Sequence, residues 1–190
     1  MYIAFDTETS GLTQDHNLLT AYFQILNENL EMINDIYLQV KYDNYCITPI
    51  ALSINKIDII EHDNKANTIQ ECQKKLVDFI EKTTKEMYYS KRLVPIGHNI
   101  EFDINFIKGS GLLPGDLYSK YISANAIDTI TISQFLKLCK AIPKTQRLGL
   151  QYITHSLGIQ SKSGFHHAKS DVEVTVSLLK KYKQMATLNL

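Results

Sequence analysis

The first twelve residues constrain the fold more than any other stretch of the chain. Residues 2–5 form a short apolar run bounded by turn residues, a pattern typical of a buried strand. Two carboxylates, Asp6 and Glu8, follow it two positions apart, just before a turn at Ser10 and Gly11. In an extended backbone, residues i and i+2 point to the same side, so both carboxylates can face one point.

Two interpretations of this acidic pair stand side by side. Like charges this close repel each other unless a cation lies between them. Mg²⁺ or Mn²⁺ would neutralise the pair, because these hard cations take oxygen ligands. The alternative is a solvated turn in which Asp6 accepts hydrogen bonds from local backbone groups.

The next part of the chain predicts the rest of an antiparallel sheet. Strand-like runs at residues 18–26 and 30–40 are joined by a plausible hairpin turn at residues 27–29. With the first strand they make three antiparallel strands. Residues 41–67 look irregular, and so long a connection inside a compact domain is more often functional than idle.

Helices and short strands alternate over the remainder. Thr68 and Glu71 have the spacing of a capping box, and the apolar face of the helix they open would cover the sheet. Gly158 would close a short helix from the C′ position. Strands are expected at 93–97 and 127–129, and a helix that ends at Leu138 should follow the second of them. Further helices are expected at 100–109, 148–157 and 168–185, and a loop at 112–116. This order indicates a mixed-sheet α/β fold, and 190 residues fit a single domain over 1–190.

The last helix carries an acidic residue on its apolar stripe. Asp171 falls at helical spacing with residues that should face inward: Ala168, Val172, Thr175, Leu178, Leu179 and Tyr182. A buried lone carboxylate is costly, so Asp171 must be paired, protonated or bound to a cation. The alternative is an Asp favoured by the macrodipole at the N-terminus of the helix.

Composition narrows the class of protein. The three cysteines, Cys46, Cys72 and Cys139, have no metal-ligand spacing, and their odd number argues against a disulfide framework. No apolar stretch is long enough to span a bilayer and no signal-peptide pattern is present, so a cytoplasmic protein without a membrane partner is expected. Net charge is zero but uneven: residues 1–103 hold 9 Lys+Arg and 16 Asp+Glu, whereas residues 104–190 hold 11 and 4. An acidic half could hold metal ions and a basic half a polyanion.

Three ordered motifs carry a resemblance to a known family. Residues 5–12 (FDTETSGL), residues 98–103 (HNIEFD), and His166 followed by Asp171 after a four-residue gap resemble the exonuclease motifs of the DEDDh 3′→5′ exonucleases. These enzymes are the DnaQ-like branch of the ribonuclease-H-like superfamily. Residues 47–57, 127–129 and 149–158 are similar to accessory segments of many members. The resemblance implies a ribonuclease-H-like mixed β-sheet, three antiparallel strands and then parallel ones, flanked by helices.

The resemblance also implies a metal site and a reaction. Four carboxylates would hold two divalent metal ions, Mg²⁺ or Mn²⁺, which clamp the attacking and leaving oxygens of an in-line displacement. Asp6 would bridge the two ions. The product would be a nucleoside 5′-monophosphate cut from a 3′ end. The implied ligands are Asp6, Glu8, Asp103 and Asp171.

A histidine completes the implied catalytic set. His166 would take a proton from the attacking water, and its place in a loop beside Gly164 would let it swing in when substrate is bound. His167 lacks the four-residue gap to Asp171 and is expected to be a surface or supporting neighbour. His98 is expected to be packed or hydrogen-bonded at a strand end, because a hard-ion site prefers oxygen.

Substrate contacts follow from the same resemblance. The backbone around Thr7 and Thr9 would hold the substrate, Leu12 would wedge against the terminal base, and Asn99 and Phe102 would flank the ribose or the penultimate base. Such apolar and aromatic contacts tolerate any base sequence. Basic residues that could follow the phosphates, or simply solubilise the surface, are Lys137, Lys140, Lys144, Arg147, Lys162 and Lys169.

Three functions remain open at this stage. The first is a 3′→5′ exonuclease acting on single-stranded DNA ends, free-standing or as a proofreading subunit, with a polymerase or other protein partner left open. The second is an RNA-directed exonuclease similar to oligoribonuclease or ribonuclease T. Contacts to the 2′-OH distinguish these two, and no motif reveals them. The third is a catalytically silent nucleic-acid-binding module, of which the loss of a ligand or of the histidine would be the sign.

Overall fold

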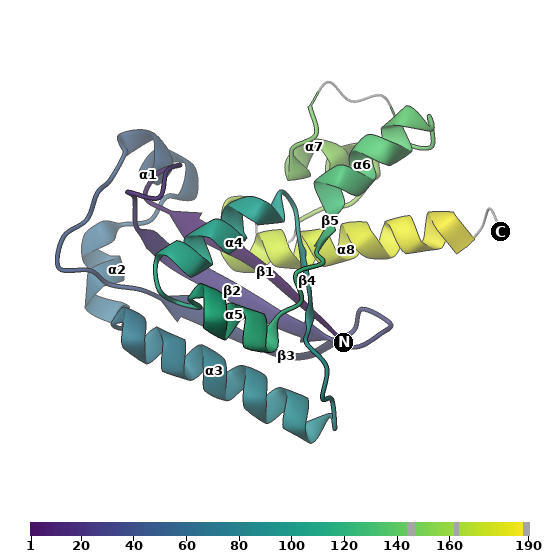
Figure 1. Cartoon of the computed structure of the whole chain (residues 1–190). Helices are drawn as coiled ribbons and strands as arrows, with labels where there is room; N and C mark the ends of the chain where they lie inside the picture. Colours follow the sequence, from purple (N-terminus) through teal and green to yellow (C-terminus); the bar gives the residue numbers. More distant parts are fainter. Residues whose placement is uncertain (144–146, 162–163, 188–190) are drawn as a thin grey trace.

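A twisted five-stranded mixed sheet forms the centre of the computed structural model, which describes residues 1–143, 147–161 and 164–187 (Figure 1). The strand order is β3-β2-β1-β4-β5. β2 pairs antiparallel with both β1 and β3, whereas β4 runs parallel to both β1 and β5. β1 therefore lies in the middle, with a hydrogen-bonded neighbour on each side. The strand bounds are β1 Tyr2–Thr9, β2 Leu18–Leu26, β3 Met32–Gln39, β4 Val94–Gly97 and β5 Ile127–Asp128.

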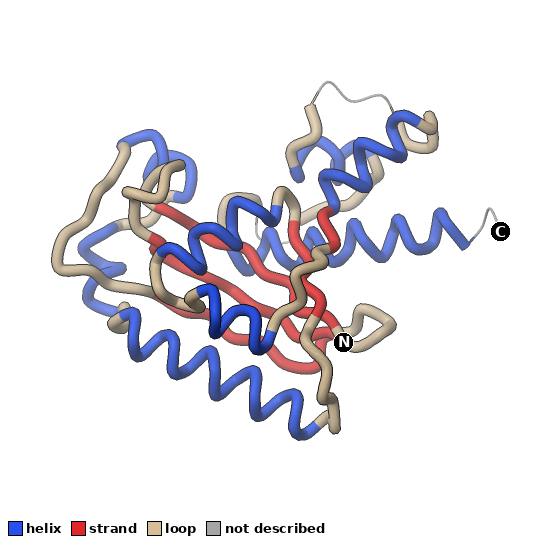
Figure 2. Tube along the Cα trace, viewed as in Figure 1, coloured by secondary structure: helices blue, strands red, loops and turns tan. Residues whose placement is uncertain are grey.

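Helices cover both faces of this sheet, as the coloured tube of Figure 2 shows. α3, α4 and α5 pack on one face, and α8 packs on the other. α6 and α7 lie against α8 around a smaller apolar cluster that includes Ile153 and Leu178. The bounds are α1 Pro49–Asn55, α2 Ile59–Lys65, α3 Ile69–Glu86, α4 Ile100–Gly109, α5 Gly115–Tyr121, α6 Thr129–Leu138, α7 Leu150–Ser156 and α8 Ala168–Thr187.

The alternation of side chains along β1 decides where the chemistry can lie. Ile3 and Phe5 are buried in the apolar cluster with α3 and α4, whereas Ala4 is buried with α8. Because successive side chains point to opposite faces of a strand, Asp6 and Glu8 continue on the side of Ala4, which faces α8. The apolar half of β1 thus anchors the strand between two layers, and its second half presents carboxylates to one of them.

The predicted mixed α/β sheet is confirmed, and so are its local signals. Thr68 and Glu71 form the expected capping box at the start of α3. Gly158 follows α7 with a left-handed φ of 70°, a conformation that favours glycine. The stripe on α8 is buried as expected, Asp171 included, except that Leu179 is only partly buried.

Three expectations were wrong in detail. Residues 41–67 are not all irregular, because Thr48 caps α1 through the Ala51 N–H and Asp58 caps α2. The region 112–116 is not all loop, since α5 begins at Gly115. β1 extends to Thr9, so Asp6 and Glu8 lie within the strand rather than beyond it. Among the residues that the structure describes, no helix is both long and apolar enough to cross a bilayer.

Candidate active site

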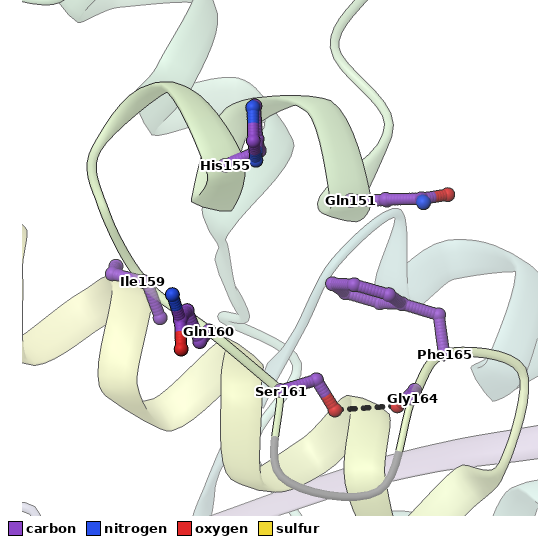
Figure 3. Close-up of a pocket in the computed structure, with 7 residues that line it drawn as sticks. All are labelled: Gln151, His155, Ile159, Gln160, Ser161, Gly164 and Phe165. Carbon is purple, nitrogen blue, oxygen red and sulfur yellow. Dashed lines mark hydrogen bonds between the residues drawn. The ribbon is translucent and has the colours of Figure 1, made fainter.

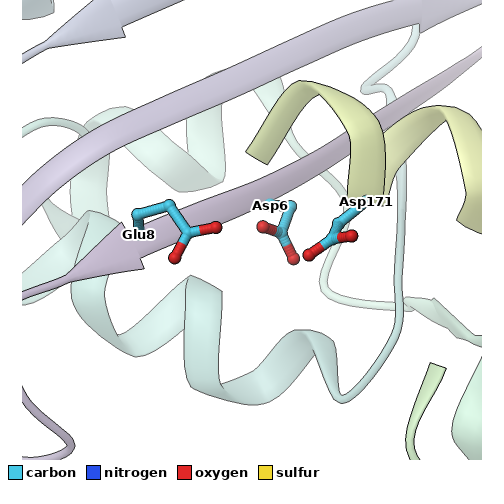
Figure 4. Close-up of side chains that lie close together, drawn as sticks. All are labelled: Asp6, Glu8 and Asp171. Atoms are coloured by element: carbon cyan, nitrogen blue, oxygen red, sulfur yellow. The ribbon is translucent and has the colours of Figure 1, made fainter. Parts of the chain in front are cut away.

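Three carboxylates converge between β1 and α8 (Figure 4). Asp6 and Glu8 project from β1, and Asp171 projects from the first turn of α8. One carboxylate oxygen from each of the three lies within 4.8 Å of the others. Two elements far apart in the sequence, each fixed by its own apolar packing, therefore bring three acids to one point.

Asp171 has one oxygen in use and one without a partner. Its Oδ2 accepts a hydrogen bond from the main-chain N–H of His166 at 3.1 Å. Its Oδ1 is buried and has no hydrogen-bond partner among the described residues. A buried polar atom left in this way is costly, and buried polar atoms normally find a partner. A cation held between the three carboxylates would supply one.

Asp103 joins the site from the other side of β1. It lies in the first turn of α4 and is 4% exposed. Its Oδ1 accepts hydrogen bonds from both the main-chain N–H of Thr7, at 2.9 Å, and the Thr7 hydroxyl, at 2.6 Å. Asp103 is not one of the three acids within 4.8 Å of one another, but its charge contributes to the raised pKa of Asp6. It therefore stands beside the cluster, held in one orientation by Thr7.

Burial raises the pKa of every one of these acids, and repulsion between their carboxylates adds to the effect at Asp6 and Glu8. Burial raises the pKa of Asp6 well above its usual value, and the charges of Asp103, Asp171 and Glu8 add to the effect. Burial, with repulsion from Asp171 and Asp103, raises the pKa of Glu8 to about 8. Burial raises the pKa of Asp103 to about 7, although the hydrogen bonds from Thr7 lower it in part. Burial likewise raises the pKa of Asp171 to about 6, although the hydrogen bond from the His166 N–H lowers it in part. A group of acids that resists ionisation in this way is one that a cation would stabilise.

The donor set fits a hard divalent cation. The clustered ligand atoms are all carboxylate oxygens, and Mg²⁺ and Mn²⁺ prefer such ligands over the nitrogen and sulfur donors that suit softer metals. The unpartnered Oδ1 of Asp171 is the structural observation that favours an ion here.

A depression of about 160 Å³ opens beside Glu8. One wall comes from β1 and the following turn, a second from α1, and a third from Phe102 of α4, whose ring packs on Phe106 at 4.9 Å. Leu12 stands at its rim, 82% exposed. The lining residues are Thr7, Glu8, Thr9, Gly11, Leu12, Ala51, Ile54, Asn55 and Phe102.

Four of the five expected substrate residues line this depression, namely Thr7, Thr9, Leu12 and Phe102. Asn99 does not line it. It forms the left-handed turn before α4, with φ of 64°, and its main-chain N–H donates to Asp128 Oδ1 at 2.9 Å. The Thr7 hydroxyl is also turned toward Asp103, so contact between these residues and a substrate stays a prediction.

The sequence did not predict that α1 would form one wall of this depression. Asn55 Nδ2 donates to the carbonyl of Thr9 at 3.1 Å, and the Thr48 N–H donates to the carbonyl of Ser10 at 2.8 Å. These bonds fasten α1 to the end of β1. The available signal was the pair Thr48-Pro49, because Thr is a favoured N-cap and Pro a favoured first helical residue.

The three histidines near the motifs have different surroundings. His166 is exposed in the loop before α8, with a left-handed φ of 66°, and its role as a base stays a prediction. The ring of His167 stacks on Tyr37, with centroids 5.5 Å apart and planes at 8°. His98 is hydrogen-bonded as expected: Nε2 donates to the Leu148 carbonyl at 2.8 Å, and Nδ1 lies 2.9 Å from the Thr129 hydroxyl.

A larger depression, of about 300 Å³, lies between α7 and the loop before α8 (Figure 3). Phe165 forms one side of it, and the hydroxyl of Ser161 donates to the Gly164 carbonyl at 2.5 Å across the loop. The described residues that line it include no acid. It therefore lacks the ligands of a hard-metal site, in spite of its size.

The basic residues are spread over the α6–α7 end of the molecule and the start of α8. Lys140 follows α6, Arg147 precedes α7 with its guanidinium over the ring of Tyr152, and Lys169 lies over the ring of Tyr22. Lys137 lies in the last turn of α6. Lys144 and Lys162 lie outside the described residues.

Comparison with known proteins yields a match at the level of fold. The chain matches no protein-family model and no curated protein sequence. Among solved structures it is similar to E. coli Exonuclease I in complex with a dT13 oligonucleotide, with a TM-score of 0.73 and 16% identity. It is also similar to the zinc-bound E. coli ExoI–ssDNA complex, with a TM-score of 0.75 and 16% identity, and to a moderately thermophilic Exonuclease I from Methylocaldum szegediense, with a TM-score of 0.74 and 18% identity.

Each of these similarities covers 96% of this chain and 40% of the Exonuclease I chain. The chain thus spans two fifths of the length of those proteins. The likeness confirms the predicted fold, a mixed β-sheet of three antiparallel strands and then parallel ones flanked by helices, which these Exonuclease I structures share.

Proposed function

We propose that this chain is a metal-dependent 3′→5′ exonuclease of the DEDDh type that hydrolyses phosphodiester bonds at single-stranded DNA ends and releases nucleoside 5′-monophosphates. The observation that carries the proposal is the meeting of Asp6, Glu8 and Asp171, with oxygens within 4.8 Å of one another and one of them buried without a partner. The fold likeness to Exonuclease I adds support.

The four acids would hold two divalent ions, Mg²⁺ or Mn²⁺. Asp6, Glu8 and Asp171 already lie close enough to share a cation. Asp103 would present its Oδ2, because Thr7 occupies its Oδ1 with two hydrogen bonds. When bound, two such ions supply charge stabilisation for the attacking and leaving oxygens of an in-line displacement.

His166 would act as the general base. A neutral imidazole has a ring nitrogen that can accept a proton from the attacking water. Its main-chain N–H is tied to Asp171, which keeps this residue beside the acids, while its side chain is exposed and can turn toward a substrate. A left-handed φ in a non-glycine residue is uncommon and often marks a functional position.

The depression beside Glu8 would receive the 3′-terminal nucleoside. Leu12 and Phe102 offer an exposed apolar edge and an aromatic ring to the base. Contacts of this kind hold bases without regard to sequence. DNA is favoured over RNA because the similar structures are complexes with dT13 and dA16 oligonucleotides. A further similar structure is an ExoI/SSB-Ct complex. A protein partner that is itself bound to single-stranded DNA is therefore part of the proposal.

The test is cleavage of 5′-labelled single-stranded DNA and RNA of matched sequence, with Mg²⁺, with Mn²⁺ or with EDTA. We expect a ladder that shortens from the 3′ end, is lost with EDTA and forms faster on DNA. Faster cleavage of RNA would favour the exoribonuclease alternative. Binding without cleavage under any metal would identify a silent nucleic-acid-binding module instead.

A further inference from the structure

A second depression adjoins the depression beside Glu8, and Asn55 lies between the two. Its volume is about 230 Å³. It is lined by the ends of β2 and β3, by the segment from Asn55 to α2, and by His167. Asn55 lines both depressions, and Thr20 in this one is the strand partner of Glu8. It therefore begins one strand away from the carboxylate cluster, on the same face of the sheet.

Two deeply buried side chains in this depression have unused hydrogen-bonding atoms. His62 is 4% exposed; its Nε2 donates to the Val40 carbonyl at 2.9 Å, so in the neutral ring Nδ1 is an acceptor, and it has no partner. Thr20 is 2% exposed, and its hydroxyl, although close enough to Tyr37 to affect the pKa of that residue, makes no hydrogen bond of normal geometry. Unpaired buried atoms are costly unless something else pairs with them.

The remaining lining residues indicate what kind of ligand could pair with these atoms. Tyr37 and the stacked His167 present an aromatic pair at one side. Gln39 adds an amide, which can both donate and accept hydrogen bonds. Together these groups suit a flat ring with a hydrogen-bonding edge.

The described lining of this depression holds two lysines and two carboxylates, and the two lysines differ in their contacts. Glu61 is paired with Lys65 at 2.5 Å, and the Asp58 carboxylate accepts the N–H groups of Ile60 and Glu61 at the start of α2. Within the described part of the chain, Lys56 has no ion-pair partner. Its ammonium group is thus free to meet an anion such as a phosphate.

We propose that this depression is a second nucleotide subsite, in which Thr20, Gln39 and His62 read the edge of a nucleobase, Tyr37 and His167 contact its ring, and Lys56 meets its phosphate. The inference rests on the proposed nuclease function. The nucleotide has two sources with the same chemistry: a unit of the bound strand, or the released nucleoside 5′-monophosphate.

Two substitutions test the subsite without disturbing the carboxylates. Thr20→Val removes the unpaired hydroxyl at nearly constant shape, so the free energy of unfolding should stay the same or rise. Lys56→Gln removes the lysine charge that has no ion-pair partner. Lys82→Gln is the matched control, because Lys82 is an exposed lysine of α3, on the opposite face of the sheet. Binding is measured in the Asp6→Asn background by fluorescence anisotropy with labelled thymidine oligomers, from a dinucleotide to an octamer, and by competition with dTMP.

We expect Thr20→Val and Lys56→Gln each to weaken binding about three- to tenfold, the range of one hydrogen bond or charge contact, while Lys82→Gln does not. Weakening confined to oligomers above a certain length would assign the subsite to the strand. Weakening confined to dTMP, with relief of product inhibition in the cleaving enzyme, would assign it to the released nucleotide.

Unchanged affinity for every oligomer and for dTMP, in a protein that still cleaves DNA, would overturn the subsite and leave the nuclease proposal intact. A protein that neither binds nor cleaves nucleic acid would overturn both.

Discussion

Thr7 holds Asp103 with two hydrogen bonds, one from its main-chain N–H at 2.9 Å and one from its hydroxyl at 2.6 Å, both to the same carboxylate oxygen. The two residues belong to β1 and α4, which approach each other at the end of the sheet where the acids gather. The bonds lower the pKa of Asp103 against the effect of burial. They also leave only Oδ2 to face a cation.

Thr7→Val should therefore lower kcat by about 10- to 100-fold, as loss of a group that orients a metal ligand commonly does. KM should change little, because the hydroxyl points to Asp103 and not to the depression. Thr7→Ser keeps a hydroxyl and should retain most of the activity. Steady-state kinetics on labelled single-stranded DNA check this. A raised KM with unchanged kcat would make Thr7 a substrate contact instead.

Asp6→Asn and Asp171→Asn should each lower kcat by about a thousandfold, equivalent to about 4 kcal/mol of transition-state stabilisation. The same changes should raise the metal-free melting temperature, since each removes one of several repelling charges. Asp78→Asn, exposed on α3, is the control and should change neither quantity. Substantial metal-dependent cleavage by Asp6→Asn would contradict the two-ion mechanism.

The metal-free protein should lose stability as the pH rises. Burial raises the folded-state pKa of Glu8 to about 8, of Asp103 to about 7 and of Asp171 to about 6, and nearby carboxylates add to the rise at Glu8 and Asp103. The unfolded values are near 4, so the folded chain binds more protons over this interval, and its free energy of unfolding falls from about pH 4 to about pH 8.

A bound cation favours the ionised carboxylates, so Mg²⁺ or Mn²⁺ should raise the melting temperature more at high pH than at low pH. Thermal denaturation in EDTA and in Mg²⁺ across this range measures both effects. A metal-free melting temperature that stays constant or climbs with pH would contradict the raised pKa values of these acids.

His166→Ala should lower kcat by about 10²- to 10⁴-fold, the usual contribution of a general base. His167→Ala should have a much smaller effect on kcat, because its ring is stacked on Tyr37. Steady-state kinetics of the two variants on labelled single-stranded DNA measure both effects. The reverse pattern would exchange the two assignments.

Leu12→Ala should raise KM for single-stranded DNA about tenfold, within the 1–3 kcal/mol that a contact with one base contributes. Leu12 stands exposed at the rim of the depression beside Glu8. Ile60→Ala is the matched control, since Ile60 is similarly exposed on α2 and does not line that depression. Equal effects of the two changes would mean that the depression does not hold the terminal base.

Patterns that repeat along one segment were enough to predict much of this structure. The two-residue period of β1 placed Asp6 and Glu8 on one side, and the helical period of α8 placed Asp171 on a buried stripe. Both periods depend on residues close in sequence, so they can be seen before the fold is known.

The details that were missed depend on contacts between distant residues. α1 and α2 span seven residues each, too few to show a helical period, and α1 is fastened by Thr9 and Ser10 of another element. Thr7 and Asp103 are 96 residues apart, so no local pattern could show that the Thr7 hydroxyl would turn to Asp103. The unpaired atoms of Thr20 and His62 likewise become visible only when packing is complete.

The arrangement of ligands along the chain has a consequence for biosynthesis. Asp6 and Glu8 emerge from the ribosome with the first strand, but Asp171 follows only with the last helix. A nascent chain can pair β1 with β2 and β3 early, since these contacts are local, whereas docking of α8 requires closure of nearly the whole chain. The carboxylate cluster is therefore complete only after α8 has docked on the sheet.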